Sequence, residues 1–226
     1  MVARLPLVYL VRHGETEWSK AGKHTSVTEV ELTSHGITQV HDLSRFVFEN
    51  TCQGFIDPKN LSQIYVSPRK RAQQTLELIK IPNKDQIPTF TDINLTEWNY
   101  GDYEGISTHE IHSSKYVFWN LWRDGCPNGE TIQQVANRSD HIIAKIMAHQ
   151  KEHLDNKPNS PGGDVLIVAH SHLLRIMACR WLNMNPEFGR NYILDTAGLC
   201  VLGYQRSMRF PVVKHWNVTS NLFQRT

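Results

Sequence analysis

The chain has 226 residues and nearly balanced charge, with 24 Lys and Arg against 22 Asp and Glu, for a formal net charge of +2. This balance creates no global field that would favour nucleic acid or an anionic membrane, so we expect neither partner. The length and the 40% hydrophobic composition are typical of a globular protein, and they predict a single domain over residues 1–226. The sequence does not indicate an oligomeric state.

The ends of the chain and its cysteines do not point to export. The N-terminal apolar run is too short to span a membrane, and it lacks the charged start and cleavage site of a signal peptide. The four cysteines are far apart and form no CxxC pair, so we expect neither a disulfide framework nor a zinc site. These features predict a cytoplasmic protein with reduced thiols. The cysteines are Cys52, Cys126, Cys179 and Cys200.

The first apolar run, residues 7–11, is uncharged and contains β-branched and aromatic side chains, which predicts a strand buried on both faces. It ends in Arg12, His13 and Gly14. Open α/β sheets bind their ligands at the carboxyl ends of the strands. The guanidinium group of arginine suits phosphate, and a neutral imidazole can attack an electrophile. This strand end therefore predicts a binding site for a phosphorylated ligand.

Two more strand ends carry similar residues. A predicted strand at 63–66 leads through Pro68, at the first position of a helix, to Arg69 and Arg71, where free helix amides favour an anion. A buried strand at 164–169 ends at His170. Because parallel strands bring their carboxyl ends to one edge, these residues are expected to meet.

The remaining segments complete an α/β pattern. Helical periodicity predicts a helix after Thr33 or Ser34, and a longer one after residues 128–131. Segments 193–204 and 210–218 predict a terminal hairpin. The fold class we expect is α/β, a three-layer α/β/α sandwich with a mostly parallel central sheet and the site above its strand ends.

Five side chains form the predicted catalytic group: Arg12, His13, Arg71, Glu97 and His170. Arginines can neutralise the oxygens of a transferring phosphoryl group, an imidazole can attack phosphorus, and a carboxylic acid can protonate the leaving alkoxide. Because arginines supply the positive charge, we expect no metal and no cofactor.

Four blocks of sequence, in order along the chain, resemble the histidine phosphatase superfamily of phosphoglycerate-mutase-like enzymes. They are VRHGET from Val11, SPRKRAQQT from Ser67 together with Glu97 in LTEWNYGDYEG, NGET from Asn128, and VAH ending at His170. Within that superfamily, the EWNYGDYEG and WRDGCPNGET segments are similar to fungal sedoheptulose-1,7-bisphosphatase-like sugar phosphatases.

The resemblance implies a role for each matched residue. His13 would be the phosphorylated nucleophile, Arg12, Arg71 and a protonated His170 would form the phosphate pocket, and Glu97 would be the general acid. Two positions depart from the usual pattern, because Ser26 and Ser171 stand where glycine is usual. The implied substrate-binding residues are Ser19, Thr25, Ser26, Arg69, Tyr100 and Ser171.

The function predicted from this resemblance is a metal-independent phosphatase that hydrolyses small sugar or polyol phosphates through a phosphohistidine intermediate. Whether it takes monophosphates or bisphosphates stays open from the sequence. Two alternatives remain open from the sequence. A phosphoglycerate-type phosphomutase would use the same phosphohistidine and return the phosphoryl group to its substrate. A catalytically silent protein would only bind a phosphometabolite.

Overall fold

The computed structural model describes residues 4–48, 55–113, 118–156 and 160–219. Its centre is a six-stranded sheet with the order β3-β2-β4-β1-β5-β6. The pairs β1–β4, β2–β4 and β2–β3 are parallel, and the pairs β1–β5 and β5–β6 are antiparallel. The strands are β1 (Val8–Arg12), β2 (Leu61–Val66), β3 (Thr89–Thr91), β4 (Asp164–Ala169), β5 (Leu199–Tyr204) and β6 (Pro211–Val218).

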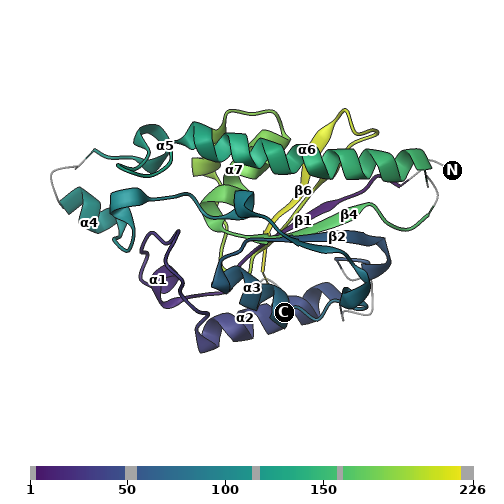
Figure 1. Cartoon of the computed structure of the whole chain (residues 1–226), viewed down its shortest axis with the longest axis horizontal. Coiled ribbons are helices and arrows are strands. Elements are labelled where there is room, and N and C mark those ends of the chain that lie inside the picture. Colours follow the sequence, from purple (N-terminus) through teal and green to yellow (C-terminus); the bar gives the residue numbers. More distant parts are fainter. Residues whose placement is uncertain (1–3, 49–54, 114–117, 157–159, 220–226) are drawn as a thin grey trace, which may run out of the picture.

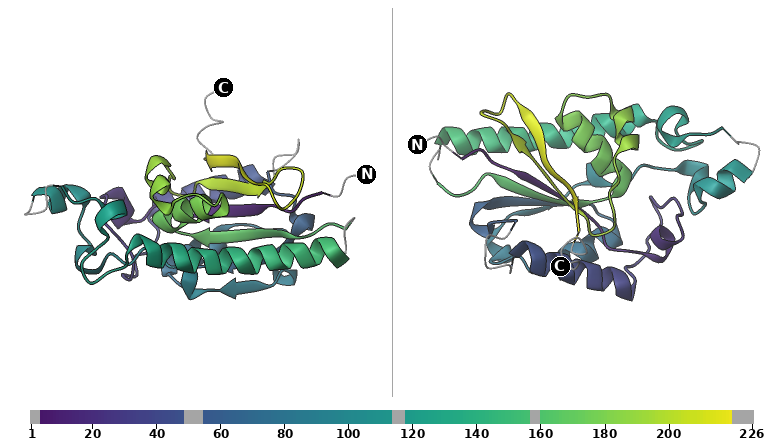
Figure 2. Two further views of the ribbon diagram at one scale, coloured as in Figure 1. Left: turned by 90° about the horizontal axis from the view of Figure 1, so that it is seen from above. Right: turned by 180° about the vertical axis from the view of Figure 1, so that it is seen from behind.

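Helices cover both faces of this sheet, as the two orientations in Figures 1 and 2 make visible. Helices α2 and α3 lie on one face, and α6 and α7 lie on the other. This arrangement confirms the predicted three-layer α/β/α fold with a mostly parallel sheet. The helices are α1 (Glu17–Lys20), α2 (Ser34–Phe48), α3 (Lys70–Leu78), α4 (Thr108–Ser113), α5 (Leu121–Asp124), α6 (Ile132–Asn156) and α7 (Ser171–Trp181).

The alternation of side chains along the central strands divides the core into two layers. In β1, Tyr9 and Val11 pack with Val40 of α2 and Leu76 of α3, while Leu10 faces the opposite layer beside α6 and α7. Because both faces are covered, β1 and β4 are buried almost throughout, as the uncharged runs predicted. The core thus fixes the strands whose carboxyl ends carry the predicted site.

Some boundaries differ from the sequence-based expectation. The first terminal strand was expected from residue 193, but β5 begins at Leu199, and 193–198 is a loop that crosses the end of β1. Thr33 caps α2, since its Oγ1 accepts from Gly36 N at 2.9 Å. Helix α3 begins at Lys70 after the N-cap Arg69, so the expected helix start at Pro68 was wrong.

The cysteine expectation can be checked for three of the four thiols. Cys126, Cys179 and Cys200 are free, and Cys52 lies outside the described residues. Within the described ranges, no helix has both the length and the apolar character needed to cross a membrane.

Candidate active site

Three parallel strand ends meet at one edge of the sheet. Strands β1 and β4 pair with Arg12 opposite Ala169, and β2 pairs with β4 so that Val66 lies opposite Val168. The next residue of each strand is therefore His13, Ser67 or His170. His13 N donates to Ala169 O at 3.0 Å, which continues the ladder into the site. The rings of His13 and His170, 157 positions apart in the printed sequence, have centroids only 5.2 Å apart.

His13 is held as a neutral imidazole with one nitrogen free. Its Nδ1 lies 2.8 Å from Gly14 O, and because a carbonyl can only accept, Nδ1 carries the proton. Nε2 then has the lone pair. Burial lowers the pKa of His13 well below 6.5, and the nearby Arg71 and Arg12 lower it further. The ring is thus uncharged at neutral pH and can act as a nucleophile.

Gly14 has a packing role at the start of this site. A Cβ at this position would lie 2.7 Å from Gly36 O and 2.9 Å from a methyl carbon of Val40, so no side chain fits against α2. Gly14 N donates to Thr75 Oγ1 at 3.1 Å. Close approach to α2 and α3 therefore requires glycine here, and it fixes the peptide that orients His13.

His170 is also neutral, and its tautomer follows from Ser67. Ser67 Oγ accepts from Arg69 N at 3.3 Å and lies 2.7 Å from His170 Nε2. In the tautomer in which the serine hydroxyl donates to Nε2, the ring proton sits on Nδ1. Burial lowers the pKa of His170 well below 6.5, with Arg71 adding to the shift. Burial thus favours a neutral ring, in which Nδ1–H is a donor with no partner among the described residues. A protonated His170 in the presence of a bound phosphoryl group stays a prediction.

Two arginines supply the charge of the site, and both are oriented by main-chain carbonyls. Arg12 Nη1 donates to Leu194 O at 2.6 Å, in the loop before β5. Arg71 is fully buried and donates to three carbonyls of the loop at residues 25–28. Burial lowers the pKa of both guanidinium groups, while Glu97 opposes that shift. Both remain cations, since arginine stays protonated in proteins.

Four buried polar side-chain atoms have no hydrogen-bond partner among the described residues, and all four are donors from predicted site residues. They are Arg12 Nε, Arg69 Nε, Arg71 Nε and His170 Nδ1. Unpaired buried donors are costly and uncommon in folded proteins. Here they come from the ends of three strands that meet beside His13, and an oxyanion is the ligand whose oxygens would satisfy them.

Glu97 is buried and bound at the start of α7. Oε1 accepts from Trp98 N and Leu173 N, both at 2.9 Å, and Oε2 accepts from His172 N at 3.0 Å. The carboxylate thus satisfies two of the free amides of the first turn of α7. Oε2 receives one N–H and Oε1 receives two, so Oε2 is the oxygen with more room for a proton.

The loop that carries Glu97 is held by an ion pair at the start of α6. Arg138 donates to Asn94 O at 2.9 Å, Thr96 O at 2.5 Å and Glu97 O at 3.0 Å. Arg138 also binds Glu130, with Nε and Oε1 2.8 Å apart. The NGET block of the sequence therefore contributes to the site by fixing the backbone at Glu97.

A cavity of about 250 Å³ opens beside His13 and Glu97. Most residues predicted from sequence lie on its wall, namely Arg12, His13, Ser19, Thr25, Glu97, Tyr100 and Ser171. Arg71 and His170 are completely buried and lie behind this wall. The further lining residues are Gly22, Lys23, His24, Thr108 and His172.

Two predicted substrate-binding residues are absent from the wall of this cavity. The hydroxyl of Ser26 donates to Glu104 Oε2 at 2.7 Å, so it is turned away from the cavity. Arg69 Nη1 donates to Val27 O and to Glu29 Oε1, both at 3.1 Å. In this structure both side chains support the loop at residues 25–28, and Arg69 Nε is buried without a partner among the described residues.

Sequence reasoning did not name His24, His172 or Ser67 as candidates, nor the lining residues Gly22, Lys23 and Thr108. Tyr100 Oη lies 2.7 Å from His172 Nδ1, and its ring lies 4.6 Å from the ring of His24. Burial lowers the pKa of His24 to about 4, and burial together with Arg175 lowers that of His172. The outer wall of the cavity is thus made of uncharged hydrogen-bonding rings. The only local signals were that Ser67 directly follows a strand and that His172 opens a helix.

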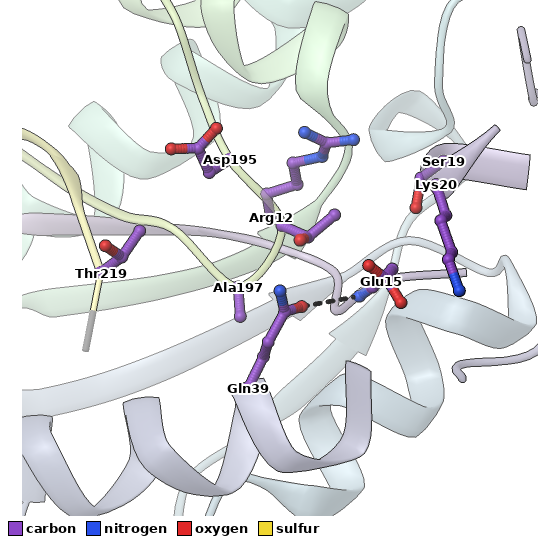
Figure 3. Close-up of a pocket in the computed structure, with 9 residues that line it drawn as sticks. Arg12, Glu15, Ser19, Lys20, Gln39, Asp195, Ala197 and Thr219 are labelled. Carbon is purple, nitrogen blue, oxygen red and sulfur yellow. Dashed lines mark hydrogen bonds between the residues drawn. The ribbon is translucent and has the colours of Figure 1, made fainter. Parts of the chain in front are cut away.

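A second cavity, of about 340 Å³, lies on the other side of Arg12 (Figure 3). Arg12 and Ser19 line both cavities. Gln39 Oε1 accepts from Glu15 N at 3.0 Å, which closes its floor. Two cations, Arg12 and Lys20, face two carboxylates, Glu15 and Asp195, so this cavity has no excess positive charge. The excess lies on the inner side, around His13.

The described ranges contain no group of three or more His, Cys, Asp or Glu side chains placed to hold a metal ion.

Comparison with known proteins gives a family and several relatives. The family model of the histidine phosphatase superfamily (branch 1) matches residues 8–219 of this chain. Sedoheptulose 1,7-bisphosphatase of Saccharomyces cerevisiae is 40% identical over 198 residues, which cover 83% of this chain and 71% of that protein. An acid phosphatase of Mycobacterium tuberculosis is 34% identical over 202 residues, covering 88% and 87% of the two chains.

The solved structures agree with this. The structure of open reading frame Rv3214 of Mycobacterium tuberculosis superposes with a TM-score of 0.80 at 31% identity, over 96% of this chain and 100% of that chain.

Proposed function

This chain belongs to the histidine phosphatase superfamily and is a phosphatase, and on that premise we propose that it hydrolyses small sugar or polyol phosphates through a phosphohistidine formed on His13. The observation that carries the proposal is the set of four unpaired buried donors around a neutral His13. A tetrahedral phosphoryl group is the ligand that fits both features at once.

In the first step, the lone pair of His13 Nε2 attacks phosphorus and the bond from phosphorus to the ester oxygen breaks. Arg12, Arg71 and the Nδ1–H of His170 neutralise and hold the phosphoryl oxygens. The bond from His13 Nδ1 to Gly14 O keeps the ring in the reactive tautomer and supports the positive charge that develops on it. No metal is required for this step, because the guanidinium groups supply the charge.

Glu97 acts as the general acid and then as the base. Protonated on Oε2, it gives its proton to the leaving sugar alkoxide; as a carboxylate, it next takes a proton from the water that attacks phosphohistidine. Its placement on the wall of the cavity beside His13 supports this role. The three main-chain bonds to Glu97 fix its position through both steps.

The outer wall supports a hydroxyl-rich leaving group. The side chains of His24, Tyr100 and His172 are uncharged and can donate to or accept from hydroxyls. One relative in the same superfamily is named as a sedoheptulose 1,7-bisphosphatase, which supports a sugar phosphate as the substrate class. That Ser19, Thr25, Tyr100 and Ser171 line the cavity supports a role for them in contacting the sugar.

The experiment is a screen for phosphate release over pentose, hexose, heptulose and polyol phosphates, with mono- and bisphosphates compared. We expect release from at least one sugar or polyol phosphate, and none after His13→Ala. Isomerisation of phosphoglycerate without phosphate release would instead show a mutase. Binding of phosphate esters with no turnover of any of them would show a silent binding protein and contradict the proposal.

A further inference from the structure

Glu104 lies outside the catalytic group, and its carboxylate accepts from three donors of the loop at residues 25–28. It precedes Gly105, whose φ of +79° requires glycine. Oε1 accepts from Ser26 N at 2.9 Å and Thr28 N at 3.0 Å, and Oε2 accepts from Ser26 N at 2.9 Å and Ser26 Oγ at 2.7 Å. Burial opposes the charged form, but the bonds from Thr28 and Ser26 outweigh it and lower the pKa of Glu104. Glu104 is therefore a carboxylate that grips one short loop.

The same loop presents its carbonyls to Arg71. Arg71 Nη2 donates to Thr25 O at 3.0 Å and to Ser26 O at 3.2 Å, and Nη1 donates to Thr28 O at 3.1 Å. These bonds use both hydrogens of Nη2 and one of Nη1. What remains is Nε–H, which has no partner, and one hydrogen on Nη1. The three carbonyl acceptors fix the plane of the guanidinium group. They thereby fix the direction of its free edge, the side that carries Nε–H and the remaining hydrogen on Nη1.

Two peptide groups connect Glu104 directly to the arginines. The peptide between Thr25 and Ser26 donates its N–H to Glu104 and accepts from Arg71 at its oxygen. The peptide between Val27 and Thr28 donates its N–H to Glu104 and accepts from Arg69 at its oxygen. In a trans peptide the N–H and C=O point in opposite directions, so each group is aligned between an anion and a cation. Bonds in such a chain strengthen one another.

We propose that Glu104 is a positioning residue that, through these two peptide groups, sets the orientation in which Arg71 meets the phosphoryl group, with Arg69 held by the same loop. The inference rests on the proposed function, since it assumes that Arg71 binds phosphate. Without Glu104, the N–H groups of Ser26 and Thr28 lose their acceptor and the loop can turn its carbonyls away. Arg71 would stay buried, but its free edge would no longer be fixed.

The hydroxyl of Ser26 adds to this grip. Its contact with Glu104 Oε2 is a third donor beyond the two main-chain N–H groups. The Ser26→Gly variant would lose this bond and keep the main-chain ones. Position 26 thus contributes to substrate binding indirectly, by holding the loop.

The test compares Glu104→Ala, Glu104→Gln and Ser26→Gly with the matched control Glu110→Ala. Glu110 also accepts from a serine main chain and hydroxyl, those of Ser107, but it is exposed, and within the described part of the chain it makes no hydrogen bond with residues 25–28. The measurements are the inhibition constant of inorganic phosphate, kcat and KM on p-nitrophenyl phosphate, and the thermal unfolding midpoint. An aryl ester is used because it needs little help from Glu97.

We expect Glu104→Ala to weaken phosphate inhibition and to lower kcat/KM roughly 10- to 100-fold, since small misplacements of binding groups cost about that much. Glu104→Gln should fall between wild type and alanine, because its single carbonyl oxygen can still accept from Ser26 N and Thr28 N. Ser26→Gly should have a smaller effect, and Glu110→Ala none on phosphate inhibition. Should Glu104→Ala fail to fold, the glutamine variant decides, with a normal unfolding midpoint and a raised inhibition constant as the expected result.

The decisive comparison is made in an Arg71→Ala background. If Glu104 acts through Arg71, adding Glu104→Ala there should change phosphate inhibition little further. Full additivity, or unchanged phosphate inhibition in Glu104→Ala alone, would overturn the inference while Arg71→Ala still shows impaired binding. Unimpaired binding by Arg71→Ala would instead contradict the proposed function itself, and the inference with it.

Discussion

Strands β1 and β4 carry a buried charged cluster at each end, and the two clusters differ in how completely their donors are paired. At the amino end, Asp164 is completely buried and accepts from Arg4, through bonds of 2.8 and 2.6 Å, from Leu7 N at 2.8 Å and from Tyr9 Oη at 3.2 Å. Each of these four donors meets the carboxylate. This is a closed ionic cluster that fastens the start of β1 to β4.

At the carboxyl end, the balance is reversed. Arg12, Arg71 and His170 each retain an unpaired buried nitrogen, and Glu97, whose charge acts on both arginines, is bound to the amides of α7. Such an arrangement is costly to fold, because buried charge and unpaired donors both lose hydration. The comparison teaches that a satisfied cluster serves the fold, and that an unsatisfied cluster built on equally rigid strands serves a ligand.

The largest effect should follow loss of the His13 imidazole. We expect His13→Ala to reduce turnover by at least about 10⁴-fold, since removing a covalent nucleophile disables the whole reaction path. Labelling with a ³²P-phosphorylated substrate should show a phosphoenzyme in the wild type and none in the variant. The matched control is His24→Ala, which removes another imidazole from the same cavity; it should retain labelling. Substantial turnover by His13→Ala would contradict the mechanism.

Removal of the acid should come next, and its size should depend on the leaving group. We expect Glu97→Gln to lower kcat on alkyl phosphates by about 10²- to 10⁴-fold, the usual range for general acid catalysis. Aryl phosphates leave without protonation and should be affected far less. Steady-state kinetics on a sugar phosphate and on p-nitrophenyl phosphate measure both, and equal losses would remove Glu97 from this role.

The amino-end cluster should show the opposite behaviour. Asp164→Ala would leave Leu7 N and Tyr9 Oη without their acceptor, and we expect the free energy of unfolding to fall by about 3 kcal/mol, since each buried donor left unpaired costs about 1 to 3 kcal/mol. The kcat/KM of the folded fraction should stay near the wild-type value. Urea unfolding followed by fluorescence, together with kinetics in native buffer, separates the two effects. A loss of kcat/KM in fully folded Asp164→Ala protein would contradict the view that the Asp164 cluster serves stability and not ligand binding.

The sequence was sufficient for those features that depend on local pattern. Uncharged runs predicted β1 and β4, and the rule that parallel strands end at one edge predicted that His13 and His170 would meet. The meeting of His13 and His170 could be predicted without knowledge of side-chain contacts, because each residue directly follows its strand. In the structure, the register pairs Arg12 with Ala169, the last residues of the two strands.

The sequence was insufficient where a loop decides which way a side chain points. Ser26 matched a position that lines the pocket, yet its hydroxyl binds Glu104, 78 positions later. His24 reaches the cavity only because its loop folds onto Tyr100. The lowered pKa of His170 could not be read from the sequence for a related reason, since burial and the nearness of Arg71 are properties of the folded chain. Such features depend on long-range packing, which periodicity does not report.

The smallest predicted effect is a loss of stability on acidification. It is caused by the neutral histidines of the candidate active site, which are His13, His24, His170 and His172. Their folded-state pKa values lie below 6.5, so at lower pH the unfolded chain binds protons that the folded chain does not, and the free energy of unfolding decreases. For His24 this contribution runs from about pH 6.5 down to its folded pKa of about 4. Urea unfolding between pH 7 and about pH 5 should therefore show a smaller decrease for His24→Asn than for the wild type. Because carboxylates elsewhere titrate equally in both proteins, the difference isolates His24, and identical slopes would show that its imidazole is not held neutral by the fold.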